Sequence, residues 1–103
     1  MSMIIQPTVG RVVWFHPSDD DVMARGSGTL AAIVANVWSD TCVNLAVFDG
    51  NGNHHSRTSV LLVQEGNPVP TGGMWCEWMP YQKGQAAKTD AVMAELRRPK
   101  VTE

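Results

Sequence analysis

The stretch that decides the fold is Thr29–Val63, TLAAIVANVWSDTCVNLAVFDGNGNHHSRTSVLLV. It contains three runs that are rich in β-branched and apolar residues, Thr29–Trp38, Val43–Phe48 and His55–Val63. Such runs are typical of strands. The short segment Ser39–Thr41 separates the first two runs, and its polar side chains can bond to nearby backbone groups in a turn. The stretch therefore predicts three consecutive strands.

The connection between the second and third runs is the strongest local signal in the chain. Asp49–Asn53 reads DGNGN, and both Asp-Gly and Asn-Gly suit turns that need a positive φ. We therefore predict a β-hairpin here. The first run, Thr29–Trp38, is apolar on both faces, which indicates a central strand or one that is buried on both sides.

Two further strands are predicted on either side of this stretch. They are Gly10–Phe15, GRVVWF, and Met74–Met79, MWCEWM. The segments His16–Gly28 and Gln64–Gly73 are rich in Gly, Pro or Asp and are expected to be exposed loops. Five short strands with one hairpin predict an all-β fold, a small five-stranded antiparallel barrel of SH3-like type with a short C-terminal helix. An OB-type barrel is the alternative.

The C-terminal part has a different composition. We expect the barrel to span residues 1–82 and a tail with a short helix to span residues 83–103. Thr89 or Asp90 is expected to begin the helix, which runs through AVMAELRR, and Pro99 to end it. Residues 1–81 hold three basic and seven acidic side chains, a net charge of -4, whereas residues 82–103 hold five and three, a net charge of +2. The tail is therefore either solvated or docked on an acidic surface of its own body or of a neighbouring subunit.

Composition limits the classes of protein that this chain can represent. It has 103 residues, of which 44% are hydrophobic and 17% charged, which is typical of a folded domain. No apolar run approaches the roughly 20 residues of a membrane helix. The formal net charge of -2 argues against generic nucleic-acid binding, because neutralising phosphates needs a basic surface. No secretory signal is recognised, so the two cysteines are expected to be reduced thiols in the cytosol.

Four tryptophans are many for this length, and we expect Trp14 and Trp38 to lie in the core. Trp75 and Trp78 are three positions apart and should point to opposite faces of a strand. One of them can be core. The other should be exposed, covered by the tail or buried between subunits, which predicts a homo-oligomer.

The sequence carries no recognisable catalytic, metal or cofactor motif. Cys42 with His54 or His55 could in principle form a pair of nucleophile and general base, but no nucleophile motif or phosphate-binding loop is present. The spacing of the candidate metal ligands fits no known pattern; they are His16, His54, His55, Cys42 and Cys76. We therefore predict no catalytic residue, no metal and no cofactor. Glu77 is interpreted as a solvent-facing residue of an edge strand, or else as a carboxylate with a raised pKa beside an apolar wall.

Aromatic and basic residues supply one candidate binding set. Such a set can stack a base and hold a phosphate, and it can equally form the centre of a protein interface. The predicted ligand- or partner-binding residues are His55, Arg57, Trp75, Glu77, Trp78, Tyr81 and Lys83.

Three segments resemble a group of small, mostly uncharacterised proteins of tailed bacteriophages. They are GRVVWF (residues 10–15), AAIVANVWSDTCVNLAVF (31–48) and WCEWMP (75–80), and the resemblance extends from about Pro7 to Gln85. It implies a phage-encoded accessory protein in the host bacterial cytoplasm. The expected function is non-enzymatic binding of a host or phage protein. The alternatives are a sponge that sequesters a host nucleotide immune signal, as an anti-defence protein would, and a structural component of the virion.

Overall fold

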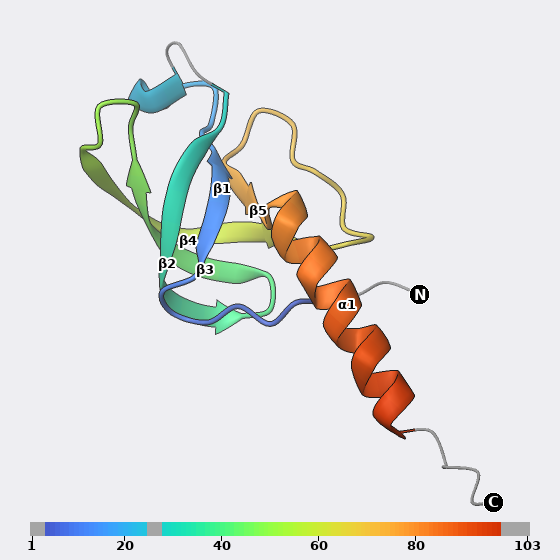
Figure 1. The fold of residues 1–103 in the computed structure, drawn as a ribbon. Coiled ribbons are helices and arrows are strands. Elements are labelled where there is room, and N and C mark those ends of the chain that lie inside the picture. Colours follow the sequence, from blue (N-terminus) through green and yellow to red (C-terminus); the bar gives the residue numbers. More distant parts are fainter. Residues whose placement is uncertain (1–3, 25–27, 98–103) are drawn as a thin grey trace, which may run out of the picture.

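The computed structural model describes residues 4–24 and 28–97, with side chains up to Thr89. Five strands form a closed barrel in which neighbours follow in chain order (Figure 1). The elements are β1 (Val12–His16), the 3-10 turn η1 (Val22–Ala24), β2 (Leu30–Ser39), β3 (Cys42–Phe48), β4 (His54–Val63), β5 (Trp75–Glu77) and α1 (Pro80–Arg97). A mostly β fold with a closed five-stranded barrel and a C-terminal helix is confirmed.

The prediction of a purely antiparallel sheet is wrong. β1 pairs with β2 and β5 in antiparallel fashion, as do β2 with β3 and β3 with β4, but β4 and β5 are parallel. The reason is geometric. Each antiparallel neighbour reverses the strand direction, and a closed ring must return to the starting direction, so five strands include at least one parallel pair. The long connection between β4 and β5 provides the crossover that a parallel pair needs.

The core follows the alternation of each strand. Val13 and Phe15 of β1 point inward, so Trp14 between them points outward and is 36% exposed. Trp38 lies at the end of β2 and is 64% exposed. The prediction that both tryptophans are core is therefore wrong. The fully buried tryptophan is Trp78, which is 1% exposed.

β5 covers only Trp75–Glu77 of the predicted strand Met74–Met79, so Trp78 lies just beyond its end; Trp78 is buried and Trp75 is half-buried. β2 is central, since it pairs with β1 and β3, but only one of its faces is buried. Thirteen hydrophobic side chains form the barrel core: Val13, Phe15, Met23, Leu30, Ala32, Val34, Val43, Leu45, Val47, Val60, Leu62, Cys76 and Trp78.

The loop after β1 is not wholly exposed as predicted. Its η1 turn directs Met23 into the core, where 7% of the residue is exposed. The turn is stabilised by Asp21, whose Oδ1 accepts a hydrogen bond from the backbone N–H of Met23 at 3.0 Å. An apolar residue inside the acidic loop therefore closes one end of the barrel.

The helix begins earlier than predicted, at Pro80 instead of near Thr89, so the expected boundary after residue 82 falls inside α1. Met79 acts as the N-cap: its carbonyl accepts bonds from the N–H groups of Gln82 and Lys83. The Gln82 Oε1 accepts a bond from the Met79 N–H at 2.9 Å, as in the second half of a capping box. Proline is favoured at the first helical position, where its missing N–H has no partner to lose.

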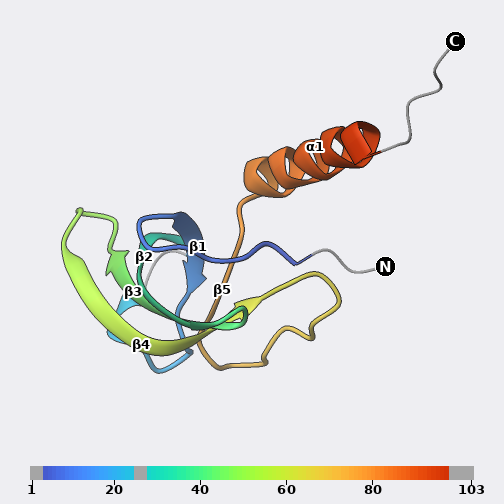
Figure 2. The same ribbon diagram turned by 90° about the horizontal axis from the view of Figure 1, so that it is seen from below.

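α1 has 18 residues and is about 27 Å long. Figures 1 and 2 show it leaving the barrel and projecting away from it. The predicted end at Pro99 lies outside the described residues. Among the described side chains of α1, Gln82 and Lys83 of its first turn make the polar contacts with the barrel.

Candidate functional site

The structure does not bring the seven predicted binding residues together. His55 and Arg57 lie on β4, near the loops at one end of the barrel. Trp75, Glu77, Trp78 and Lys83 line a small cavity of about 260 Å³. Tyr81 lines a different, larger groove.

Arg57 is held by an internal ion pair. Its Nε and Nη2 donate to the two carboxylate oxygens of Asp21 at 3.0 and 2.9 Å, and the Asp21 side chain is only 7% exposed. The bonded guanidinium lowers the pKa of Asp21, and the carboxylate raises the pKa of Arg57. A bidentate pair of this kind is strong and directional. The positive charge of Arg57 is therefore neutralised within the fold by Asp21.

His55 is engaged in the same way with the hairpin. Its Nε2 lies 2.9 Å from the Asp49 Oδ2. The backbone N–H groups of Asn51 and Asn53 also donate to Asp49. The hydrogen bond from His55 is the main cause that lowers the pKa of Asp49 to about 2. These contacts stabilise the β3–β4 turn.

Three residues of the small cavity, Trp75, Glu77 and Lys83, are linked by contacts with one another or with His16 of β1. The rings of His16 and Trp75 stack with centroids 4.0 Å apart, and the His16 Nε2 lies 2.7 Å from the Glu77 Oε2. The Lys83 Nζ lies 3.8 Å from the other oxygen of Glu77. Glu77 is thus partnered on both sides. The interpretation of its strand as an edge is wrong, because β5 lies between β1 and β4 in a closed barrel.

Trp78 separates this cavity from the core. Its Nε1 is buried and has no hydrogen-bond partner among the residues that the structure describes. An unpaired buried donor costs about 1–3 kcal/mol. The burial of the large ring must outweigh this cost.

The thiols are poorly placed for chemistry. Burial, with smaller effects of Glu77 and Cys42, raises the pKa of the Cys76 thiol to about 12. Cys42 begins β3, whereas His54 pairs with Phe48 at its other end, about 20 Å along the strand. Within residues 4–24 and 28–97, no group of three or more His, Cys, Asp or Glu side chains could hold a metal ion.

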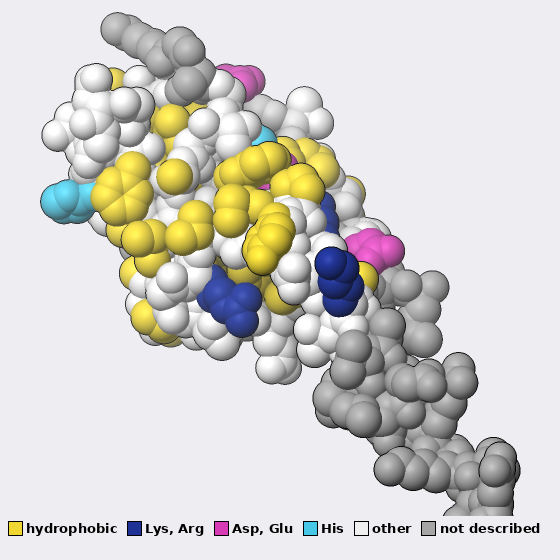
Figure 3. Space-filling view, viewed as in Figure 1, with side chains coloured by type: hydrophobic (Ala, Val, Ile, Leu, Met, Phe, Trp, Pro, Cys, Tyr) yellow, Lys and Arg dark blue, Asp and Glu magenta, His cyan; other side chains and the backbone are white. Residues whose placement is uncertain are grey.

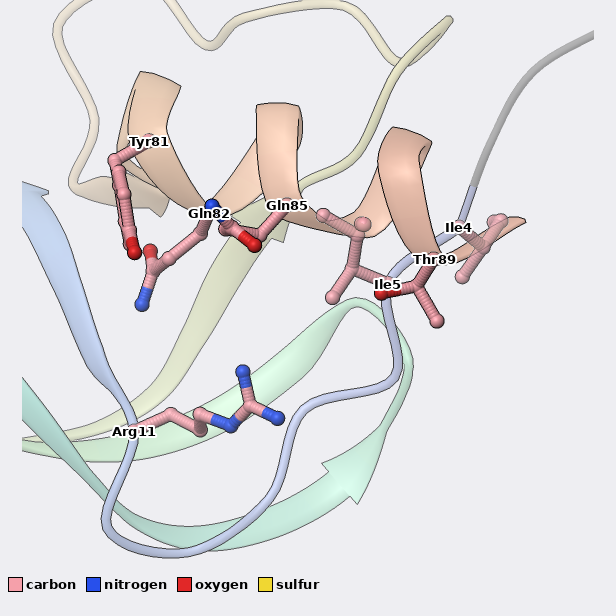
Figure 4. A pocket seen from close by; sticks show the side chains of 8 residues that line it. Ile4, Ile5, Arg11, Tyr81, Gln82, Gln85 and Thr89 are labelled. Atoms are coloured by element: carbon pink, nitrogen blue, oxygen red, sulfur yellow. The ribbon is translucent and has the colours of Figure 1, made fainter. Parts of the chain in front are cut away.

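A second and larger cavity, about 380 Å³, is a groove between α1 and the N-terminal segment, which we call the helix groove (Figure 4). It is lined by Ile4, Ile5, Arg11, Tyr81, Gln82, Gln85, Ala86 and Thr89. In Figure 4 the Arg11 guanidinium points into the space beneath α1.

Two glutamines fix the walls of the helix groove. The buried Gln64 side chain accepts from the N–H of Ile5 at 3.2 Å and donates to its carbonyl at 2.8 Å. It also donates to the Asp40 carbonyl at 2.9 Å. On the other wall, the Gln82 Nε2 donates to the Val12 carbonyl at 2.7 Å. The N-terminal segment and α1 are thus each bonded to the barrel.

A second candidate surface covers the outside of β1, β2 and β3. Register places Val12 opposite Ile33, Ile33 opposite Ala46, and Trp14 opposite Ala31. We call these residues, together with Phe48, the outer face. Figure 3 shows hydrophobic side chains gathered in a band across this side of the barrel. Trp14, Val12 and Ile33 are each 36–37% exposed.

Sequence reasoning missed the residues that shape these surfaces. Arg11 and Gln64 carried no pattern that distinguished them. Gln82 did carry a signal, because Pro80 followed by a glutamine two residues later matches a helix start. The outer face could have been inferred by assigning Val13 and Phe15 to the core.

Comparison with protein-family models, curated proteins and solved structures finds no match to this chain. Among the described residues, no helix is both long and apolar enough to cross a membrane.

Proposed function

We propose that this protein is a non-enzymatic interaction module, a barrel of SH3-like type that assembles with copies of itself and binds a host or phage protein. The outer face carries this proposal. It is a partly exposed apolar surface built from three adjacent strands, with Trp14 on it, and the charged Glu77 of β5 lies opposite Trp14 at its border. Larger contiguous patches of this kind mark interaction sites, and tryptophan is enriched at interface centres.

We assign the outer face to a second copy of the chain. Charge complementarity supports this occupant, because residues 1–81 carry a net charge of -4 and residues 82–103 carry +2. α1 projects away from its own barrel, so it is free to reach a neighbour (Figure 2). One copy can therefore cover the outer face of another while its basic tail lies against an acidic body.

Light scattering and native mass spectrometry across a dilution series test the assembly. We expect an oligomer for the wild type and about a 10-fold or greater weakening of its dissociation constant for Trp14→Ser. Trp38→Ser is the matched control: Trp38 is more exposed but lies about 17 Å further along β2 than Ile33. A monomeric wild type, or equal effects of the two substitutions, would contradict the proposal.

The resemblance to phage proteins supports a role in the infected host cytoplasm. Capture of a host or phage protein on tagged wild type, and its loss on Trp14→Ser, tests this part. Detection of the chain in purified particles would favour the virion alternative.

The nucleotide-sponge alternative has weaker support. The basic residues of the predicted set already have acidic partners: Arg57 with Asp21, His55 with Asp49 and Lys83 with Glu77. A thermal-shift screen with cyclic and linear nucleotides separates the two proposals, because a tightly bound nucleotide raises the melting temperature.

A further inference from the structure

We propose that the helix groove binds an extended peptide segment that bears a carboxylate, and that Arg11 holds this carboxylate. The proposal deepens the proposed function, on which it rests, by naming the chemistry of the partner. The groove and the outer face share no residue, and they meet where Arg11 is followed by Val12, whose carbonyl accepts a hydrogen bond from Gln82.

The first argument is charge. Among the eight described residues that line the helix groove, Arg11 is the one that is charged. Its side chain has no hydrogen bond or ion pair in the part of the chain that the structure describes, whereas Arg57 is bonded to Asp21. A guanidinium presents a planar fork of donors that matches a carboxylate with two parallel bonds. A single cation suits one carboxylate better than the two phosphates of a dinucleotide.

The second argument is shape. Tyr81, Gln85 and Thr89 follow one another at intervals of one helical turn along α1, so this wall is about 12 Å long. That is the length of about four residues of extended chain. The opposite wall carries the apolar Ile4 and Ile5. An amide, a hydroxyl and a phenol on one side can bond to a peptide backbone, while apolar peptide side chains pack on the other.

The third argument is preorganisation. Gln64 fixes Ile5, and Gln82 fixes the start of α1 to β1. The hydrogen bonds of both side chains are made to backbone groups of the protein itself. The walls are therefore in place before a peptide arrives, which lowers the entropic cost of binding.

The test uses the full chain and fluorescein-labelled tetrapeptides with three apolar residues followed by a C-terminal Glu, each compared with an amidated Gln version. Fluorescence polarisation should detect the acidic peptides and not the neutral ones. Arg11→Gln should weaken binding about 10- to 100-fold, the range expected for a charge-assisted bond. Lys88→Gln is the matched control, because Lys88 is an exposed cation of α1 that does not line the groove.

The outcomes are separable from those of the proposed function. The oligomeric state of Arg11→Gln, measured on the same samples, should equal that of the wild type. Acidic peptides that fail to bind, or that bind Arg11→Gln and wild type equally, overturn the inference. Competition by a nucleotide that depends on Arg11, without peptide binding, also overturns it. A monomeric wild type that still binds the peptides through Arg11 refutes only the self-assembly.

Discussion

The two ends of the barrel are stabilised in different ways. At the end that holds the acidic loop and the hairpin, Arg57 and His55 each pair with an aspartate. At the end that holds α1, Gln64 and Gln82 bond to the backbone, and Trp78 fills the interior. We call these the loop end and the helix end.

The difference shows which charged side chain does not contribute to the stability of the fold. The loop end neutralises its cation with a nearly buried partner, so that cation contributes to stability. The helix end is held by the neutral Gln64 and Gln82 and by Lys83 beside Glu77, and the Arg11 side chain has no partner among the described residues. Arg11 is thus expected to be dispensable for folding, which is why it is informative for function.

The largest expected effect is at the helix end. Trp78→Ala should lower the free energy of unfolding by about 3–5 kcal/mol, because it empties the largest buried site. Urea denaturation measures this change. Trp38→Ala, at an exposed tryptophan, should change it by about 0.5 kcal/mol. Similar losses for both would show that Trp78 does not fill the core.

The second prediction concerns the loop end. Arg57→Gln leaves the nearly buried Asp21 carboxylate without its cation and should cost about 1.5–3 kcal/mol. Adding Asp21→Asn should recover part of the loss, since the two sites are coupled. Arg11→Gln should stay within about 0.5 kcal/mol of the wild type. A large decrease in the free energy of unfolding for Arg11→Gln in the same denaturation series would contradict the inference that the fold does not need the Arg11 charge.

The third prediction concerns the attachment of α1. Gln82→Ala removes a bond to the helix start and a bond to β1, and should cost about 1 kcal/mol together with some helical signal. Circular dichroism during thermal unfolding measures both quantities. Gln85→Ala, one turn along the same helix wall, is the control and should leave them unchanged. Equal behaviour of the two variants would rule out the anchoring role of Gln82.

The smallest effect is a pH dependence at the loop end. The pKa of Asp49 falls from its ordinary value of 3.8 to about 2 in the folded protein. A lowered folded-state pKa stabilises the protein above the ordinary value, and the contribution is lost as the pH falls through about 2. Denaturation midpoints should therefore decrease across this acid range, and less steeply in Asp49→Asn. An unchanged slope in this variant would show that Asp49 is not responsible.

The sequence predicts the strands well because their signals are local. Alternating β-branched residues and the DGNGN turn locate β2, β3 and β4 to within one residue at either end. Long-range features were not accessible in the same way. The parallel β4–β5 pair depends on closure of the ring of strands. The exposure of Trp14 depends on which face of β1 is turned toward the core.

The candidate site was predicted less well for the same reason. Arg57 looked available because its partner, Asp21, is 36 positions away in an apparently exposed loop. The helix groove joins residues near the N-terminus to residues of α1, and no local pattern links them. Four of the seven predicted residues line one cavity, and these four are close together in the chain: Trp75, Glu77, Trp78 and Lys83.

The parallel pair has a consequence for how the chain folds. β2, β3 and β4 form consecutive antiparallel pairs, whose loops are short and close rapidly. β5 must then insert between β4 and β1, and its contact with His16 spans 61 positions of sequence at Glu77. During synthesis, the barrel cannot close before Glu77 has left the ribosome. We therefore expect ring closure by β5 to follow the pairing of β2, β3 and β4 during folding.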